Sequence, residues 1–121
     1  MILCSGKVYY HLYEARQEKK ITNVALVRIE QLYPFPDNDL MEALQEYKKL
    51  KDVVWCQEEP INQGAWYSSQ HHMRNIINKF NKNLTLSYAG SEASAAPACG
   101  YMSLHLEEQR KFINEALVYK S

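Results

Sequence analysis

The sequence predicts an α/β domain in which a mostly parallel sheet carries helices on both faces. Short apolar stretches alternate along the chain with longer segments whose apolar residues recur at helical spacing. This strand–helix alternation is typical of parallel strands joined by crossover helices. The 121 residues suffice for one hydrophobic core and are too few for two, so residues 1–121 are expected to form a single domain.

The composition and the cysteines exclude several classes of function. The 14 basic and 14 acidic residues cancel, so no net field favours nucleic acid or an anionic membrane. No apolar run approaches the ~18 residues of a membrane-spanning helix. Cys4, Cys56 and Cys99 are odd in number and far apart. We interpret them as small buried hydrophobes in a reducing compartment, rather than as a disulfide or a zinc site.

A short strand and a helix open the chain. Ile2–Cys4 is apolar throughout. The following segment repeats apolar residues at helical spacing, namely Val8, Leu12 and Ala15. We expect Ser5 to cap this helix, because serine oxygens accept hydrogen bonds from free N–H groups at a helix start.

A second strand and a second helix follow. Asn23–Ile29 predicts a strand that is apolar almost throughout, and Tyr33–Pro36 predicts a rigid proline-rich loop. Asp37 or Asn38 is expected to cap the next helix. The apolar face of that helix consists of Leu40, Met41, Leu44 and Tyr47.

The stretch VVWCQEEPINQGAW organises the rest of the sequence. Val53–Cys56 predicts a strand covered on both faces, and Pro60 is expected to stop it because proline has no N–H to donate. Glu58 and Glu59 are adjacent, so their side chains should point to opposite sides of an extended chain. This argues against a paired general acid and base. It favours an acidic strand end that contacts another subunit or caps a helix.

The second half of the chain predicts a long helix, a strand, a loop and a last helix. The helix, Ala65–Phe80, carries one apolar stripe made of Trp66, Ser69, Met73, Ile76, Ile77 and Phe80. Leu84–Tyr88 alternates in polarity as an edge strand does, and Ala89–Gly100 is expected to be a loop of small residues. The last helix is marked by Met102, Leu106, Gln109, Ile113 and Leu117.

If the four strands are parallel, their carboxyl ends meet at one edge of the sheet. That edge would hold Ser5–Gly6, Glu30–Gln31, Gln57–Glu59 and Ala89–Gly90. One hypothesis is an anion or nucleotide site, with free N–H groups and Lys7 at the helix start and Gln31 as a neutral hydrogen-bonding group. The alternative is ordinary helix capping, and the glycines of a dinucleotide fingerprint or a P-loop are missing.

The sequence contains no complete catalytic set. His71 and His72 are neighbours without a partner four residues away, which is typical of surface histidines and not of a metal site. No serine or cysteine lies on a nucleophile elbow. Seven aromatic residues are compatible either with a contact surface or with half-buried packing. They are Tyr9, Tyr10, Tyr13, Tyr33, Trp66, Tyr67 and Tyr101.

Four long motifs carry a resemblance to a known family. They are LCSGKVYY at Leu3–Tyr10, VRIEQLYPFP at Val27–Pro36, WCQEEPINQGAW at Trp55–Trp66 and YAGSEASAAPACGYMSLH at Tyr88–His105. In this order and spacing they resemble the C-terminal domain of 2-oxoglutarate dehydrogenase, most of all its bacterial form. The resemblance covers essentially the whole chain. It implies the transketolase C-terminal fold, a three-layer α/β/α sandwich that is mostly parallel with one antiparallel strand.

The resemblance also implies an activity, cofactors and partners. The whole enzyme would decarboxylate 2-oxoglutarate on thiamin diphosphate with Mg²⁺. It would then pass the succinyl group to the lipoyl arm of dihydrolipoyl succinyltransferase in the citric acid cycle. In the family the cofactors and catalytic histidines belong to upstream domains. This chain would therefore be an inactive, cofactor-free, cytoplasmic fragment that supports a homodimer and its active-site channel.

Two sets of site residues follow from the resemblance. The residues expected at or near the interface are Glu58, Glu59, Asn62, Gln63, Trp66 and the loop of residues 89–100. Some relatives bind AMP or acetyl-CoA in this domain, and the matching motifs place an effector site on Ser5, Lys7 and Gln31. Actinobacterial relatives carry arginines after the proline loop, where this chain has residues 37–39, DND. The difference argues against phosphate binding there.

Overall fold

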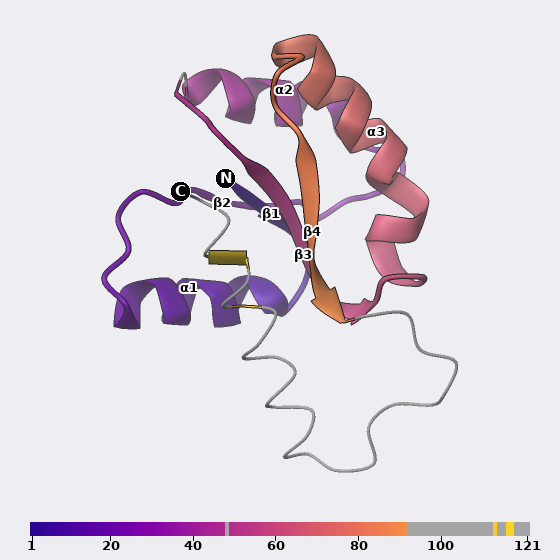
Figure 1. Cartoon of the computed structure of the whole chain (residues 1–121). Helices are drawn as coiled ribbons and strands as arrows, with labels where there is room; N and C mark the ends of the chain where they lie inside the picture. Colours follow the sequence, from indigo (N-terminus) through magenta and orange to yellow (C-terminus); the bar gives the residue numbers. More distant parts are fainter. Residues whose placement is uncertain (48, 92–112, 114–115, 118–121) are drawn as a thin grey trace.

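Figure 1 shows a computed structural model of the chain, which describes residues 1–47, 49–91, 113, 116 and 117. Strands and helices alternate along the described part of the chain, which confirms the predicted α/β class. The elements are β1 (Ile2–Cys4), α1 (Val8–Glu18), β2 (Leu26–Arg28), α2 (Asp37–Glu46), β3 (Val53–Pro60), α3 (Gly64–Phe80) and β4 (Leu86–Ser91). No helix among these residues is long and apolar enough to cross a membrane.

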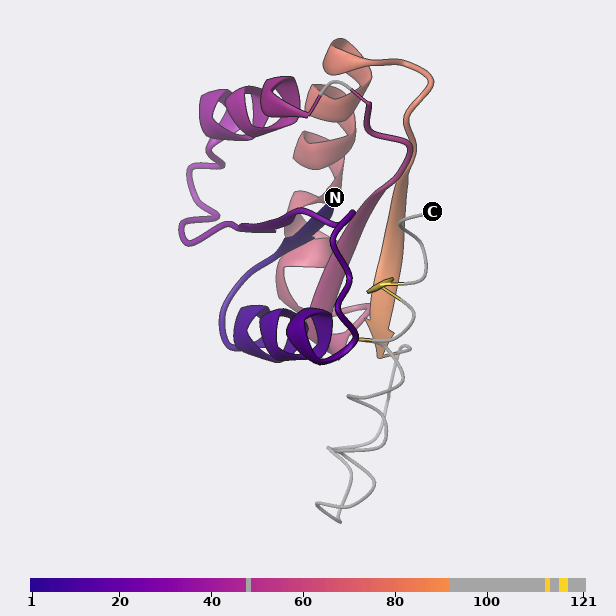
Figure 2. The same cartoon turned by 90° about the vertical axis from the view of Figure 1, so that its left-hand side faces the viewer.

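The four strands form a parallel sheet with the order β2-β1-β3-β4. Cys4 of β1 is in register with Arg28 of β2 and with Cys56 of β3. Cys56 is in turn in register with Ala89 of β4, and Figure 2 shows β3 and β4 side by side along their length. Every pair among the described strands is parallel, so the antiparallel strand that the resemblance implied is not among them.

Helices cover both faces of the sheet, as Figure 1 shows, which confirms the three-layer arrangement. Alternate residues of one strand pack into the two different core layers, because successive side chains of a strand point to opposite faces. Leu3 and Trp55 pack in the layer with α2 and α3. Cys4 and Cys56 pack in the layer with α1, and both are buried cysteines outside any disulfide, as predicted.

Strand β2 is shorter than predicted. The sequence suggested Asn23–Ile29, and only Leu26–Arg28 is a strand. The cause is its neighbour: β1 has three residues, and each of them pairs with one residue of β2. The flanking residues Val24 and Ile29 are buried in the two core layers without lengthening the ladder. Apolar character therefore predicted burial correctly and strand length wrongly.

Both predicted helix caps are wrong. The N-cap of α1 is Lys7 and not Ser5, and the N-cap of α2 is Pro36, neither with a side-chain cap bond. Gly6 occupies the turn before α1 with a φ of 76°, a left-handed conformation that favours glycine. Asp37 lies inside the first turn of α2, where a negative charge suits the helix dipole.

Strand β4 runs further than predicted. β3 ends at Pro60, the residue expected to stop it, after a register irregularity between Gln57 and Pro60. The last residues of β3 provide partners for residues that the sequence placed in a loop. Gly90 is in register with Gln57, and Ser91 with Pro60. Ala89 and Gly90 therefore belong to β4, which is an edge strand of the described sheet, as predicted.

The predicted helical faces are largely confirmed. Five of the six stripe residues of α3 are buried, and Phe80 is partly buried. Leu40 and Leu44 of α2 are buried, whereas Tyr47 is 42% exposed at the C-cap. Of the predicted last helix, Ile113 and Leu117 are buried in the layer of α1. The described residues do not include Met102, Leu106 and Gln109, nor Cys99 and Tyr101.

Candidate functional site

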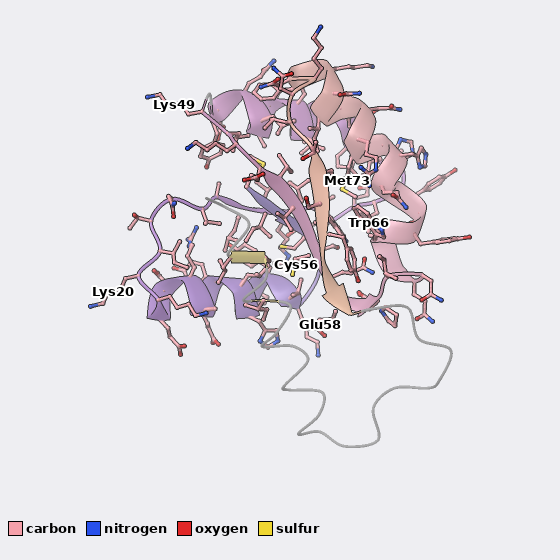
Figure 3. All side chains as sticks on the ribbon, in the orientation of Figure 1. Lys20, Lys49, Cys56, Glu58, Trp66 and Met73 are labelled. Atoms are coloured by element: carbon pink, nitrogen blue, oxygen red, sulfur yellow. The ribbon has the colours of Figure 1, made fainter. Side chains whose placement is uncertain are left out.

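The carboxyl ends of the four described strands lie at the same edge of the sheet, which we call the carboxyl edge. The parallel direction of all pairs requires this. Ser5 follows β1, Glu30–Gln31 lie just after β2, and Glu58 lies near the end of β3. Figure 3 shows Glu58 at the end of β3, beside the start of α1. Residues 58–63, at the end of β3 and in the turn that follows it, lie at this edge, and we call them the tip.

The two acidic residues of the tip point in different directions, as predicted. The Oε1 atom of Glu58 lies 3.7 Å from Nε2 of His11 on α1, and both side chains are partly exposed. Glu59 lies on the side of α3, because a Cβ added to Gly64 would come within 3.1 Å of its Cβ. The pair therefore does not share a proton between two carboxylates.

The tip is organised by Gln57, a buried side chain just before it. Gln57 is 2% exposed and lies on the α3 face of β3. Its Oε1 accepts a hydrogen bond from Nε1 of Trp55 at 2.9 Å and another from the backbone N–H of Trp66 at 3.0 Å. The carbonyl end of this amide thus joins β3 to the first turn of α3.

The amide nitrogen of Gln57 closes the turn between β3 and α3. It lies within hydrogen-bond distance of three backbone carbonyl oxygens, those of Glu59 at 3.0 Å, Pro60 at 3.0 Å and Gln63 at 2.9 Å. A glutamine has two N–H donors and one carbonyl, so its whole hydrogen-bonding capacity is used inside the fold. The sequence pattern alone predicts Gln57 as a polar residue at the point where the strand leaves the sheet. A polar residue two positions after a buried tryptophan, on the same strand face, was the missed signal.

Two glycines allow the chain to pack closely against Gln57. Gly64 begins α3 with a φ of 67°, and a Cβ added there would lie 3.2 Å from Oε1 of Gln57. A Cβ added to Gly90 would lie 2.6 Å from the backbone oxygen of Gln57 and 2.6 Å from the hydroxyl oxygen of Tyr88. A larger residue at Gly90 would clash with β3 and Tyr88, and one at Gly64 would be disfavoured by the positive φ and by tight contacts with Glu59 and Gln57.

Gly90→Ala is expected to lower the free energy of unfolding by about 1–3 kcal/mol, because the added methyl overpacks β3 and β4. Urea unfolding measures the loss, with Thr85→Ala at an exposed position as the control. Tyr88→Phe removes one of the clashing atoms, so the same substitution should cost less in that background. A Gly90→Ala loss equal to that of the control would contradict the packing described here.

Tyr88 supports the tip from β4. Its hydroxyl donates a hydrogen bond to the backbone oxygen of Glu59 at 3.3 Å, and its ring lies against Trp66 at a centroid distance of 5.2 Å. Burial raises the pKa of Tyr88 to about 12, against which the hydrogen bond with Gln57 acts more weakly. The phenol is therefore neutral near pH 7 and able to donate.

The predicted interface residues divide into exposed and buried groups. Glu59, Asn62 and Gln63 are exposed, and Glu58 is partly buried. Trp66 is 7% exposed and lies in the core layer of α3, with the guanidinium carbon of Arg74 5.3 Å from the centre of its ring. The outer surface of the tip thus carries a carboxylate and two amides, while Trp66 is buried in the core.

The three predicted effector residues are not joined by any contact among the described residues. Ser5 is partly buried, and Lys7 and Gln31 are exposed. The side-chain amide of Gln31 donates to the backbone oxygen of Tyr33 at 3.3 Å. The effector site therefore stays a prediction.

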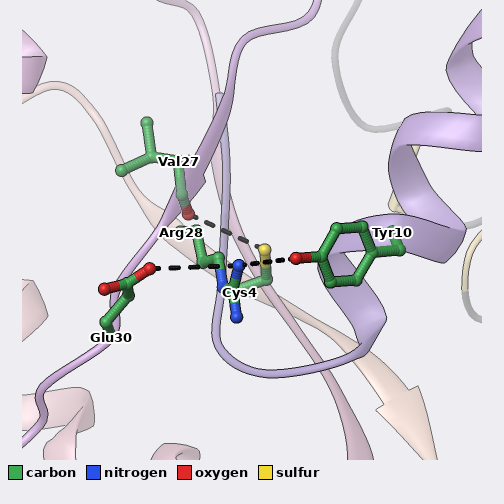
Figure 4. Close-up of polar contacts among 5 residues, drawn as sticks. All are labelled: Cys4, Tyr10, Val27, Arg28 and Glu30. Carbon is green, nitrogen blue, oxygen red and sulfur yellow. Dashed lines mark hydrogen bonds and ion pairs between the residues drawn. The ribbon is translucent and has the colours of Figure 1, made fainter.

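Sequence reasoning missed Arg28 at the same edge. Its Nη1 donates to the hydroxyl of Tyr10 at 3.1 Å and lies 3.9 Å from Oε1 of Glu30, as Figure 4 shows. The hydrogen bond with Tyr10 is the main cause of a raised pKa at Arg28. The guanidinium carbon also lies 5.7 Å from the ring centre of Tyr9. No role was predicted for Arg28 because the strand was predicted from its apolar residues alone.

The histidines and the aromatic residues do not form a single site. His71 and His72 are exposed, as predicted, and Phe35 stacks on His72 at 5.5 Å. No group of three or more potential ligands able to hold a metal occurs in the part of the chain that the structure describes. Tyr10 on α1 and Tyr67 on α3 are exposed on opposite layers, so the predicted aromatic surface is not continuous between them.

Together these features define a parallel three-layer α/β domain whose strand ends present a closely hydrogen-bonded turn. Residues 1–117 match the family described as 2-oxoglutarate dehydrogenase C-terminal, and the chain belongs to this family.

Three relatives show how far the similarity extends. The chain is 59% identical over 116 residues to a 2-oxoglutarate dehydrogenase E1 component of Azotobacter vinelandii, with 96% of the chain covered. It is 50% identical over 119 residues to the E1 component of Haemophilus influenzae, with 98% covered. It is 42% identical over 118 residues to the mitochondrial 2-oxoglutarate dehydrogenase of Schizosaccharomyces pombe, also with 98% covered. The match spans 12% of the length of each relative.

Proposed function

We propose that this chain serves as the C-terminal domain of an enzyme that decarboxylates 2-oxoglutarate and transfers the succinyl group to lipoamide in the citric acid cycle. The match of residues 1–117 to the C-terminal family carries this proposal. The partners would be the upstream domains of the same chain, a second subunit, and dihydrolipoyl succinyltransferase through the whole complex. A cytoplasmic location is part of the same proposal.

The task of the domain itself is to support the homodimer and the wall of the active-site channel. The exposed groups of the tip favour this role, because Glu59, Asn62 and Gln63 offer a carboxylate and two amides on a turn closed from within. Polar groups of this kind suit the rim of an interface, where they set orientation and partner choice.

Thiamin diphosphate and Mg²⁺ are proposed to bind to the upstream domains. Mg²⁺ is usually held by one or two carboxylates together with phosphates of the bound ligand. In the described tip, Glu58 and Glu59 diverge to different layers. The neighbouring amide of Gln57 is fully used within the protein. These residues do not provide a convergent set of donors for the cofactor.

The isolated chain of 121 residues is therefore expected neither to bind thiamin diphosphate nor to turn over 2-oxoglutarate. Titration calorimetry with thiamin diphosphate and Mg²⁺ tests the first statement, and an assay with an artificial electron acceptor tests the second. The full-length enzyme provides the positive control for both. Micromolar cofactor binding by the isolated chain would contradict the proposed division of labour.

In the full-length enzyme, Glu59→Lys is expected to weaken dimerisation about tenfold or more, because a like or unpaired charge at an interface is unfavourable. Analytical ultracentrifugation measures the dimer dissociation constant. Glu46→Lys is the matched control, since Glu46 is an exposed glutamate at the end of α2, away from the tip. Equal dissociation constants for the two variants would show that the tip is not part of the dimer interface.

A further inference from the structure

We propose that Gln57 is the positioning residue of the tip: its buried amide fixes the conformation in which residues 58–63 dock against the second subunit of the homodimer. The inference rests on the proposed function of the tip as an interface. It concerns a residue that has no exposed surface to offer a partner, since Gln57 is 2% exposed. Gln57 would act through the backbone that it holds.

The orientation of the Gln57 amide follows from the chemistry of its partners. Both groups near Oε1 are N–H donors, the indole of Trp55 and the backbone of Trp66. The three backbone groups within hydrogen-bond distance of Nε2 are carbonyl oxygens, which only accept. Exchanging the two ends of the amide would place donors against donors and acceptors against acceptors, so one orientation alone satisfies the site.

The amide nitrogen fixes the backbone on both sides of the exposed residues. Its carbonyl partners belong to Glu59, Pro60 and Gln63, which enclose Ile61 and Asn62. A backbone hydrogen bond also crosses this turn, from the N–H of Gln63 to the oxygen of Pro60 at 2.8 Å. Without Gln57, the carbonyls of Glu59, Pro60 and Gln63 would each lose one hydrogen bond in a part-buried position. Tyr88 and the N–H of Gln63 would still donate to the first two, so the loss costs free energy and loosens the turn.

The surroundings of the amide restrict which side chain can do this. Gly64 and Gly90 bring backbone close to Gln57, and Tyr88 adds a hydrogen bond to the same carbonyl of Glu59. Glutamate has the shape of glutamine but carries no donor when ionised. Its carboxylate would then face three carbonyl oxygens, so both burial and repulsion would raise its pKa. Protonation would restore one donor.

A fixed tip has a consequence for docking. Immobilising a flexible turn during association reduces affinity, and a turn that is already ordered avoids that loss. The exposed side chains of Glu59 and Asn62 would therefore meet the partner surface in a conformation set by Gln57.

The test compares Gln57→Glu and Gln57→Met with wild type in the full-length enzyme. We expect Gln57→Glu to weaken the dimer about tenfold at pH 8 and to recover most of that loss at pH 5.5, where a neutral carboxylic acid donates again. Gln57→Met lacks any donor and should be weakened at both pH values. Hydrogen exchange should show faster exchange of the backbone N–H groups of residues 58, 59 and 61–63 in each weakened state.

Two matched variants separate positioning from stability and charge. Leu44→Ala removes a fully buried side chain of α2 and should lower the melting temperature while leaving the dimer dissociation constant within about twofold of wild type, because Leu44 lies away from the tip. Gln63→Glu adds a charge to an exposed side chain of the tip and should lack the recovery at pH 5.5.

The outcomes distinguish the two proposals. If Glu59→Lys weakens the dimer and both Gln57 variants stay within twofold of wild type, Gln57 does not position the tip and the interface stands. If Glu59→Lys also leaves the dimer unchanged, the proposed interface itself is wrong. Equal weakening by Leu44→Ala and Gln57→Met would reduce Gln57 to a general contributor to stability and overturn the positioning role.

Discussion

Trp55→Ala is expected to lower the free energy of unfolding by about 3–5 kcal/mol, the range for deleting a large aromatic side chain from a core. Trp55 is 1% exposed and packs in the layer between the sheet and α3. Its indole N–H also donates to Gln57, so the substitution removes packing and a buried hydrogen bond together. A domain with a total stability of about 5–15 kcal/mol would lose much of it.

Trp55→Phe is the control that separates these two contributions. Phenylalanine keeps an aromatic ring in the core and lacks the N–H, so we expect a smaller loss than for alanine. Urea unfolding followed by circular dichroism measures both variants. A loss below about 1 kcal/mol for Trp55→Ala would show that the core around Trp55 does not determine the stability of the fold.

The domain is expected to lose stability in alkaline solution through Cys4. Burial raises the pKa of the Cys4 thiol from 9.0 to about 12, a rise that the nearby charge of Arg28 opposes more weakly. The unfolded chain therefore releases this proton at lower pH than the folded chain. The contribution of Cys4 is complete below pH 9 and falls as the pH rises towards 12. The difference corresponds to roughly 4 kcal/mol in all, of which about half is lost by pH 10.5.

Cys4→Ala isolates this effect. Its stability at pH 7 should be lower than that of wild type because a buried side chain is shortened, but its decline between pH 9 and 10.5 should be shallower. Tyr88, whose pKa is also raised, remains in both proteins and contributes equally to their alkaline loss. Parallel curves for wild type and Cys4→Ala would mean that the thiol is not protected by burial.

The sequence by itself determined the class of the fold and the layers of the core. Strand–helix alternation predicted the parallel sheet. The spacing of apolar residues predicted the buried face of α3, including the polar residue Ser69. The adjacency of Glu58 and Glu59 predicted that they diverge, since side chains of a strand alternate. These features depend on local periodicity, which a single sequence contains.

The tertiary structure alone decided the lengths of the strands and the arrangement of the tip. β2 is short because β1 provides only three partners, and β4 extends to Ser91 because β3 continues to Pro60. Gln57 acquired its role from groups on two elements, the indole of Trp55 and the turn that leads into α3. These hydrogen bonds join residues two to nine positions apart and depend on how the turn folds back on β3, which apolar periodicity does not encode. The contacts of Gln57 are therefore determined only by the packing of α3 against β3.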